Sequence, residues 1–169
     1  MSIDRKEPST TAAEREMLDG WLDYHRATLE MKCEGLAPEE LRLRAVPPSS
    51  LSLLGLVRHM AEVERGWFRN TFRGEEAPPL YYTDERPDDD FDDLESTGPE
   101  EVFATWHAEC AHAREVSAAA SLDELGKKQR RTGESFSMRW ILTHMIEEYA
   151  RHNGHADLLR ETIDGSTGD

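Results

Sequence analysis

The sequence predicts an all-α protein, a four-helix bundle with a long crossover between its second and third helices. Four stretches place apolar side chains three or four residues apart, which is the spacing of one face of an α-helix. No stretch of useful length alternates apolar and polar residues as a half-buried strand does. Residues 74–98, between the second and third stretches, follow neither pattern. In a chain of 169 residues, we expect residues 1–169 to form one domain.

The first two helices are expected at residues 11–35 and 50–73. Gly35 and Gly74 are suited to end them, because glycine readily adopts the left-handed backbone conformation that closes a helix. The second helix has a well-defined apolar face, made of Leu53, Leu56, Met60, Val63 and Trp67.

The crossover at residues 74–98 is rich in proline and aspartate and is too long for an ordinary turn. Aspartates at alternate positions from Asp88 resemble a calcium-binding loop. That loop requires Gly at its sixth position and Glu at its twelfth, where this sequence has Asp93 and Pro99. We therefore expect a solvated acidic linker without regular strands.

The last two helices are expected at residues 99–120 and 137–163. Between them, residues 121–135 read as a short helix or turn followed by a basic loop. Ser137 is a candidate N-cap for the last helix and Gly165 a candidate stop.

The composition excludes several classes of protein. The formal net charge is −15, and so acidic a surface repels nucleic acid. No apolar run approaches the ~20 residues that span a bilayer, and the first residues lack the apolar core of a signal peptide, so we expect a cytoplasmic protein without a membrane partner. The two cysteines, Cys33 and Cys110, cannot form a disulfide framework or a cysteine-based zinc finger.

The last helix carries a candidate metal-binding pair. Glu148 and His152 are four residues apart, hence about 40° apart around the helix axis, and they lie on or beside its apolar face. A carboxylate directed at a core is costly unless it is paired or bound to a cation. His59, at the edge of the second helix's apolar face, would complete a site of two histidines and one carboxylate. Such a set leaves coordination positions open, as catalytic metal sites do.

Two alternatives to a metal remain at this point: a buried Glu148–His152 hydrogen bond, and a core ion pair between Glu148 and an Arg or Lys. The margin of the same helical face holds His144 and His155, each of which is a candidate fourth ligand or hydrogen-bonding partner of a ligand. The remaining candidates rank lower, with His25 expected in the core, His107 marginal, His112 facing outward, Cys110 buried and Cys33 near a helix end.

Two segments resemble the DinB-like superfamily. Residues 52–68, SLLGLVRHMAEVERGWF, resemble its second helix, and residues 144–161, HMIEEYARHNGHADLLRE, resemble its last core helix. The order and spacing of the four helices agree as well. The last motif is similar to that of an uncharacterised branch related to mycothiol- and bacillithiol-dependent transferases and to the N-terminal domain of mycothiol-dependent maleylpyruvate isomerase.

The resemblance implies a divalent metal, zinc most often and nickel in some members, held by three side chains. Matched position by position, these are His59, Glu148 and His152. Many relatives have histidine where this chain has Glu148, but the isomerase branch has glutamate there. His155 stands where many relatives carry glutamine. Its axial offset from Glu148 is about 10 Å, so we expect it to line the mouth of the site rather than bind the metal.

The resemblance also implies a reaction. A low-molecular-weight thiol such as mycothiol would bind as the thiolate and attack a small electrophile, giving an S-conjugate or an isomer. Two alternatives remain, a metal-dependent hydrolase and a stress protein that binds a metal and a small ligand without turnover. Many relatives form homodimers, and Phe68 and Phe72, outside the apolar face of the second helix, are candidates for such an interface.

Overall fold

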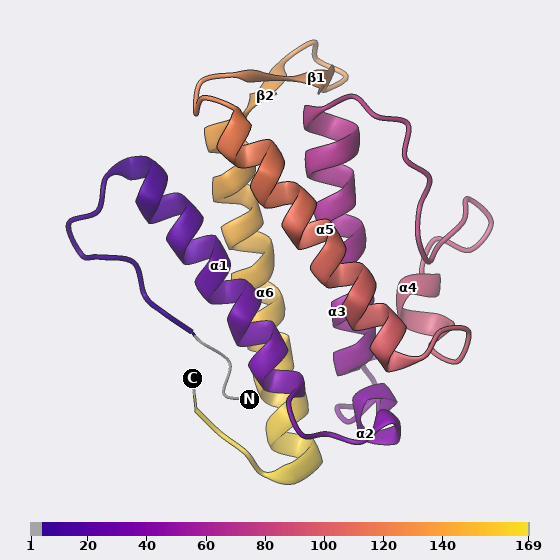
Figure 1. Cartoon of the computed structure of the whole chain (residues 1–169). Coiled ribbons are helices and arrows are strands. Elements are labelled where there is room, and N and C mark those ends of the chain that lie inside the picture. Colours follow the sequence, from indigo (N-terminus) through magenta and orange to yellow (C-terminus); the bar gives the residue numbers. More distant parts are fainter. Residues whose placement is uncertain (1–4, 169) are drawn as a thin grey trace.

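The computed structural model describes residues 5–168 and confirms the predicted four-helix bundle (Figure 1). Each of the four main helices begins and ends within a few residues of its expected bounds, except that the second changes character half-way. These helices are α1 (Glu14–Cys33), α3 (Leu53–Glu64) continued by the π-helix η1 (Arg65–Phe72), α5 (Pro99–Ala119) and α6 (Met138–Asp164). No helix among the described residues is long and apolar enough to cross a membrane.

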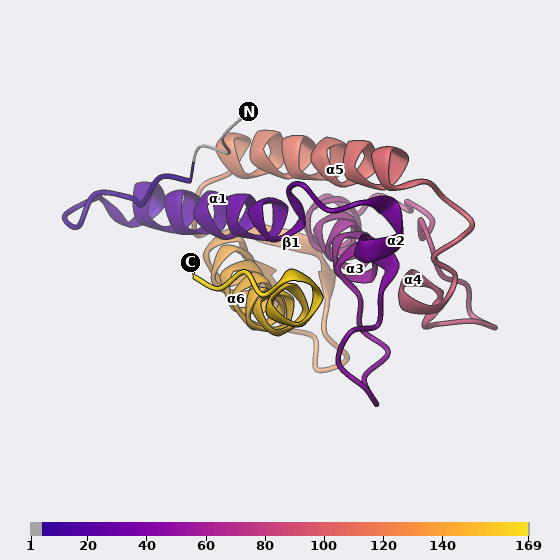
Figure 2. The ribbon, with the colours of Figure 1, turned by 90° about the horizontal axis from the view of Figure 1, so that it is seen from below.

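The long crossover follows from the directions of the helices. Figure 1 shows α3 and α5 running the same way, so the chain after η1 must return along the whole bundle before α5 begins. Seen from below, α5 lies on one side of the bundle and α6 on the other, with α1 and α3 between them (Figure 2). Two short helices interrupt the connections, α2 (Pro38–Arg42) before α3 and α4 (Asp89–Asp92) within the crossover.

A small antiparallel hairpin, β1 (Leu125–Gln129) and β2 (Ser135–Ser137), covers the end of the bundle before α6. The expected turn is present at residues 122–123, but the basic segment after it forms a strand, so the expectation of a basic loop was wrong. Gly126 explains the strand: a Cβ atom there would lie 3.0 Å from the Thr71 carbonyl oxygen, so only glycine lets β1 approach η1 this closely. Gly133, at φ 86°, supplies the turn.

The π-helical segment changes which side chains face the core. In a π-helix each backbone N–H bonds to the carbonyl five residues earlier, so the turn is wider and each residue advances by a smaller angle than in an α-helix. Phe68 and Phe72 consequently turn inward and are only 1% and 3% exposed. The suggestion that these two rings form an exposed dimer face is wrong.

The predicted ends of the helices agree with the structure. The Ser137 hydroxyl accepts a hydrogen bond from the Trp140 backbone N–H at 3.2 Å and so caps α6. The expected stops Gly35 and Gly165 have φ values of 79° and 78°, a left-handed conformation that favours glycine.

A polar network joins the four main helices inside the apolar core. Arg26 of α1 donates two hydrogen bonds of 2.8 Å to the carboxylate of Glu64 on α3. The Tyr149 hydroxyl of α6 donates to the same carboxylate at 2.8 Å and accepts from the Trp106 indole N–H of α5 at 2.9 Å. All four side chains are buried. Because every helix contributes one member, the network fixes the relative positions of the helices as well as their pairing.

Burial governs the charges in this network. Burial alone would lower the pKa of Arg26, but the adjacent Glu64 carboxylate raises it above its usual range, so the guanidinium stays charged. Burial also raises the pKa of Tyr149, which keeps its hydroxyl available as a donor. The Arg26 guanidinium therefore carries its charge at physiological pH.

We expect Glu64→Gln to destabilise the protein by about 3 kcal/mol or more, because it leaves the Arg26 charge buried without a counter-charge. Urea unfolding followed by circular dichroism measures the loss. The matched control is Asp92→Asn, which removes a surface ion pair with Arg44 at 2.8 Å and should cost less than about 1 kcal/mol. Equal costs for the two variants would contradict the structural role of the network.

Candidate metal centre

Three side chains from two helices, α3 and α6, meet at one point. His59 of α3 and Glu148 and His152 of α6 each offer one ligand atom, and these atoms all lie within 4.8 Å of one another. The rings of His59 and His152 are 4.8 Å apart, edge to face. The structure thus brings together the three residues singled out in the sequence.

The three side chains are partly shielded from solvent. The exposed fractions of His59, Glu148 and His152 are 27%, 18% and 13%. Burial, and then the neighbouring His59 and His155, lower the pKa of His152 to about 4. The His152 ring is therefore neutral at physiological pH, and one of its nitrogens carries the lone pair that a metal requires.

The crossover supplies a fourth component that the sequence did not reveal. His59 Nδ1 donates a hydrogen bond of 2.8 Å to Asp90 Oδ2, and the Asp90 side chain is only 8% exposed. The expectation of a solvated acidic linker was thus wrong for Asp90 and for its neighbour Asp89, both of which are buried. With Nδ1 protonated, the lone pair of His59 lies on Nε2, and a carboxylate partner of this kind fixes the tautomer and orientation of a metal-binding histidine.

A buried arginine holds Asp90 in place. Arg58, next to His59 on α3 and 1% exposed, donates hydrogen bonds to the carbonyl oxygens of Asp89 at 2.8 Å and Asp90 at 2.9 Å. Its guanidinium also lies 4.2 Å from the centre of the Tyr81 ring. The crossover is therefore attached to the helix that carries His59, at the level of His59 itself.

His144 lies on the same stripe of α6, one turn before Glu148. Its Nε2 is 3.2 Å from Glu148 Oε1, and its ring packs against Trp67 at 4.7 Å and Trp140 at 4.9 Å. With Glu147 these residues form a second group close enough to hold an ion. Glu147 is exposed and already paired with Arg151, so the group centred on His59 is the better metal site.

His155 lies beside His152, with their Nδ1 atoms 3.4 Å apart. It is half-buried and is not one of the three residues whose ligand atoms cluster within 4.8 Å. Its assignment to the mouth of the site stays a prediction.

The donor set suits zinc. Two imidazole nitrogens and one carboxylate oxygen are ligands that Zn²⁺ accepts at about 2.0–2.2 Å, which places neighbouring ligand atoms roughly 3.3 Å apart in a tetrahedron. In this structure the three ligand atoms lie within 4.8 Å of one another, close enough to hold a metal ion. Nickel accepts the same ligands, so the residues fit a divalent metal without selecting it.

A comparison with protein families now places the chain. The family model described as mycothiol-S-transferase matches residues 17–165. The chain belongs to the mycothiol-S-transferase family. This is a DinB-like family, so the resemblance of the second and last helices is confirmed. No curated protein matches the sequence significantly.

The other histidines of this mycothiol-S-transferase family member lie apart from the candidate centre. His25 is half-buried, and its Nδ1 atom lies 3.3 Å from the side-chain amide nitrogen of Asn153. His107 Nε2 lies 3.0 Å from Glu30 Oε1. His112, expected to face outward, is instead 22% exposed and lies 3.9 Å from Glu75.

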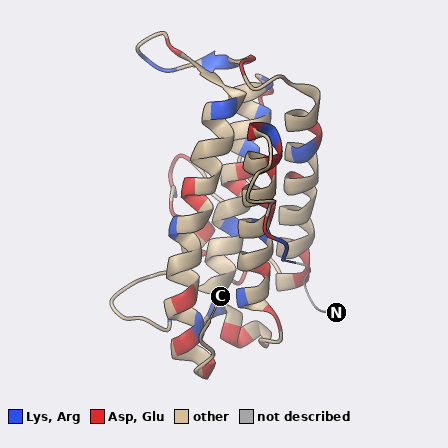
Figure 3. Cartoon of the chain, turned by 90° about the vertical axis from the view of Figure 1, so that its left-hand side faces the viewer, with Lys and Arg blue, Asp and Glu red and all other residues tan. Residues whose placement is uncertain are grey.

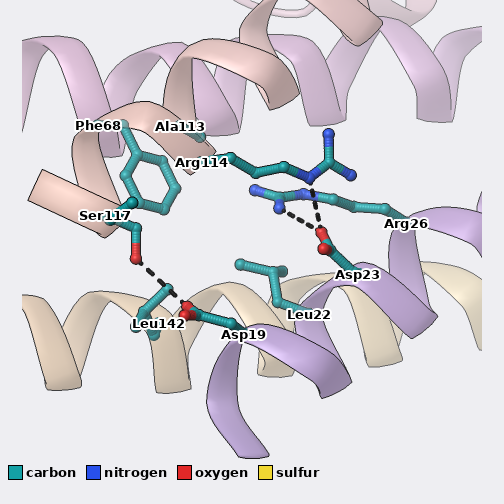
Figure 4. Close-up of a pocket in the computed structure, with 10 residues that line it drawn as sticks. Asp19, Leu22, Asp23, Arg26, Phe68, Ala113, Arg114, Ser117 and Leu142 are labelled. Carbon is teal, nitrogen blue, oxygen red and sulfur yellow. Dashed lines mark hydrogen bonds and ion pairs between the residues drawn. The ribbon is translucent and has the colours of Figure 1, made fainter. Parts of the chain in front are cut away.

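A separate cavity of about 210 Å³ lies between α1 and α5 and contains none of the histidines (Figure 4). Its charged side chains satisfy one another: Asp23 accepts hydrogen bonds of 2.9 Å from both Arg26 and Arg114. Phe68 and Leu142 close its inner end. The cavity therefore has no free ligating group and is not the candidate site.

We expect His59→Ala, Glu148→Ala and His152→Ala each to lose stoichiometric metal, because each removes one of three ligands. Elemental analysis of the purified, folded variants measures the loss. His112→Ala is the control, since its ring lies on α5 outside the cluster, and it should keep the metal. Retention of full metal by all three ligand variants would refute the assignment.

We expect Asp90→Ala to weaken metal affinity about 10- to 100-fold, because His59 loses the partner that orients it. Competition with a chromogenic chelator measures the affinity. Asp90→Asn should recover part of it, since an amide oxygen can still accept from Nδ1. Asp88→Ala, at an exposed position two residues earlier, is the matched control and should bind metal as the wild type does. Identical affinities of the Asp90→Ala and Asp88→Ala variants would contradict this role.

Proposed function

We propose that this protein is a metal-dependent S-transferase that uses mycothiol as its thiol and a small electrophile as its second substrate. The observation that supports the proposal is the meeting of His59, Glu148 and His152 at one point in a member of the mycothiol-S-transferase family. Family membership suggests the thiol, and the side chains offer the means of activating it.

A divalent cation bound at this site, zinc by expectation, would act as a Lewis acid that favours the thiolate over the thiol. Three protein ligands leave room for a substrate sulfur, as in catalytic rather than structural sites. The half-buried setting of Glu148 and His152 limits water around the sulfur, which preserves its nucleophilicity.

The protein's own groups would position the reactants rather than exchange protons with them. The mycothiol S–H bond breaks and its proton passes to solvent; the sulfur then uses a lone pair to form a C–S bond with the electrophile. In a substitution the leaving group departs with the electrons of its bond to carbon, and in an isomerisation the thiolate departs again. Asp90 holds His59 in the orientation that this site requires.

The two cysteines are arranged so that they do not compete for the electrophile. Cys33 and Cys110 are 5% and 2% exposed. Burial raises the pKa of Cys33 to about 12, and burial together with the nearby Glu64 carboxylate raises that of Cys110 as well. Neither thiol forms an appreciable amount of thiolate at neutral pH, so the protein is protected against alkylation by its own substrate.

The test is a thiol-conjugation assay with purified, metal-loaded protein, mycothiol and 1-chloro-2,4-dinitrobenzene. We expect conjugation that is lost with chelator and restored by added metal. His155→Ala should retain stoichiometric metal while conjugation falls, because that ring is expected to contact substrate at the mouth of the site. Loss of metal from a folded His155→Ala variant would make His155 a ligand. Thiol-independent hydrolysis would support the hydrolase alternative, and metal binding without turnover the binding-protein alternative.

A further inference from the structure

The β1–β2 hairpin concentrates positive charge in an acidic protein. The segment Leu125–Ser137 contains four cationic residues and a single carboxylate, Glu134, in a chain of net charge −15. Figure 3 shows the blue segments gathered on the hairpin at the top of the bundle. Within residues 5–168, none of the four pairs with a carboxylate. They are Lys127, Lys128, Arg130 and Arg131.

One of these cations lies over a set of aromatic rings. The Arg130 guanidinium is 5.0 Å from the centre of the Phe136 ring and 5.2 Å from that of Trp140. Trp67 contacts both of these rings, at 5.1 and 5.2 Å. We call Trp67, Phe136 and Trp140 the aromatic shelf. Glu134, which accepts from the Thr132 hydroxyl at 3.2 Å, leaves the Arg130 charge uncompensated.

The shelf borders a surface concavity. Arg130, Phe136 and Trp140 line a hollow of about 560 Å³ together with Leu125, Glu134, Ser135 and Ser137. That volume falls within the range of small-molecule sites, roughly 300–1,000 Å³. Trp140 is 37% exposed, so part of its ring is accessible to a ligand beside Arg130.

The shelf is linked to the candidate metal centre through the side chain of His144. The Trp140 ring stacks on His144 at 4.9 Å, and His144 Nε2 lies 3.2 Å from Glu148 Oε1. Trp140, His144, Glu148 and His152 are spaced by four residues and so form one stripe along α6. The rise from Trp140 to Glu148 is about 12 Å, which an extended small molecule can span.

From this arrangement we propose that the aromatic shelf and Arg130 bind the electrophile, and that the electrophile is a planar, unsaturated molecule with a carboxylate at the end remote from its reacting carbon. The flat part packs against the exposed part of the Trp140 ring, and the carboxylate accepts hydrogen bonds from the Arg130 guanidinium. The inference rests on the proposed function, because only a thiolate held at the metal centre makes the far end of the shelf a place of reaction.

Electrostatics favours an anion beside the cations of the hairpin. A surface of net charge −15 repels anionic substrates in general, whereas the hairpin creates a local region of the opposite sign. At the metal centre the charges of a divalent ion, Glu148 and a bound thiolate would sum to zero, so an anionic group is attracted more strongly to Arg130 than to the centre. The shelf therefore also orients the substrate, with its uncharged end toward the thiolate.

The test compares binding of 2-naphthoate and its uncharged analogue 2-naphthamide to metal-loaded protein by isothermal titration calorimetry. We expect the wild type to bind the carboxylate about tenfold more tightly than the amide, a preference that added salt reduces. Arg130→Gln should abolish the preference. Arg131→Gln, at an exposed neighbouring position outside the hollow, should retain it and thereby control for net charge and for binding of the carboxylate to the metal.

Trp140→Leu should weaken the binding of naphthoate and naphthamide alike, because it removes the aromatic contact surface. Stoichiometric metal should be retained, because Trp140 is not a metal ligand. Equal binding of the two compounds by the wild type, or equal effects of Arg130→Gln and Arg131→Gln, would overturn the assignment of the shelf. Binding does not depend on turnover, so the two proposals fail separately. A protein that prefers naphthoate through Arg130 but does not conjugate mycothiol would refute the proposed function and leave this subsite standing.

Discussion

The buried ion pair between Arg26 and Glu64 is the constraint on which the rest of the structure depends. A charge so far from water is tolerated only when its partner is in place, and here the partner's oxygens are also shared with Tyr149. Any displacement of α1, α3 or α6 would break one of these bonds. Apolar packing alone would permit helices to slide along one another, whereas this network has a single satisfactory geometry.

The same network fixes the positions of the residues that form the candidate metal centre. Tyr149 enters the network from the residue next to Glu148, and the Glu64 of the network lies little more than one turn after His59. The same contacts that hold α3 against α6 therefore set the separation of the ligands. A second attachment acts from outside, where Arg58 fixes the crossover and the crossover presents Asp90 to His59.

The two sides of α6 differ in composition because one packs in the core and the other carries the candidate ligands. One side contributes Met145, Tyr149 and Ala156 to the core. The other side carries the stripe of Trp140, His144, Glu148 and His152. The π-helix η1 contacts both sides of α6. It turns Phe68 into the core, while the Trp67 ring packs against Trp140. A plain α-helix could not serve both surfaces with this sequence.

The sequence by itself determined the four helices and the three candidate ligands, because helical periodicity and the i, i+4 spacing of Glu148 and His152 are local properties. His144 was placed there at the margin of the same helical face, whereas the position of Trp140 beside it and the relation of both to a basic hairpin were not. Only the tertiary structure decided the role of Asp90, the inward turn of Phe72 and the partner of Glu64. Each of these depends on a contact between residues remote in sequence or on a change of helix type, and no local sequence pattern encodes either. An aspartate in an acidic run is expected to be solvated, and only the fold shows the buried arginine and the histidine that contact Asp90.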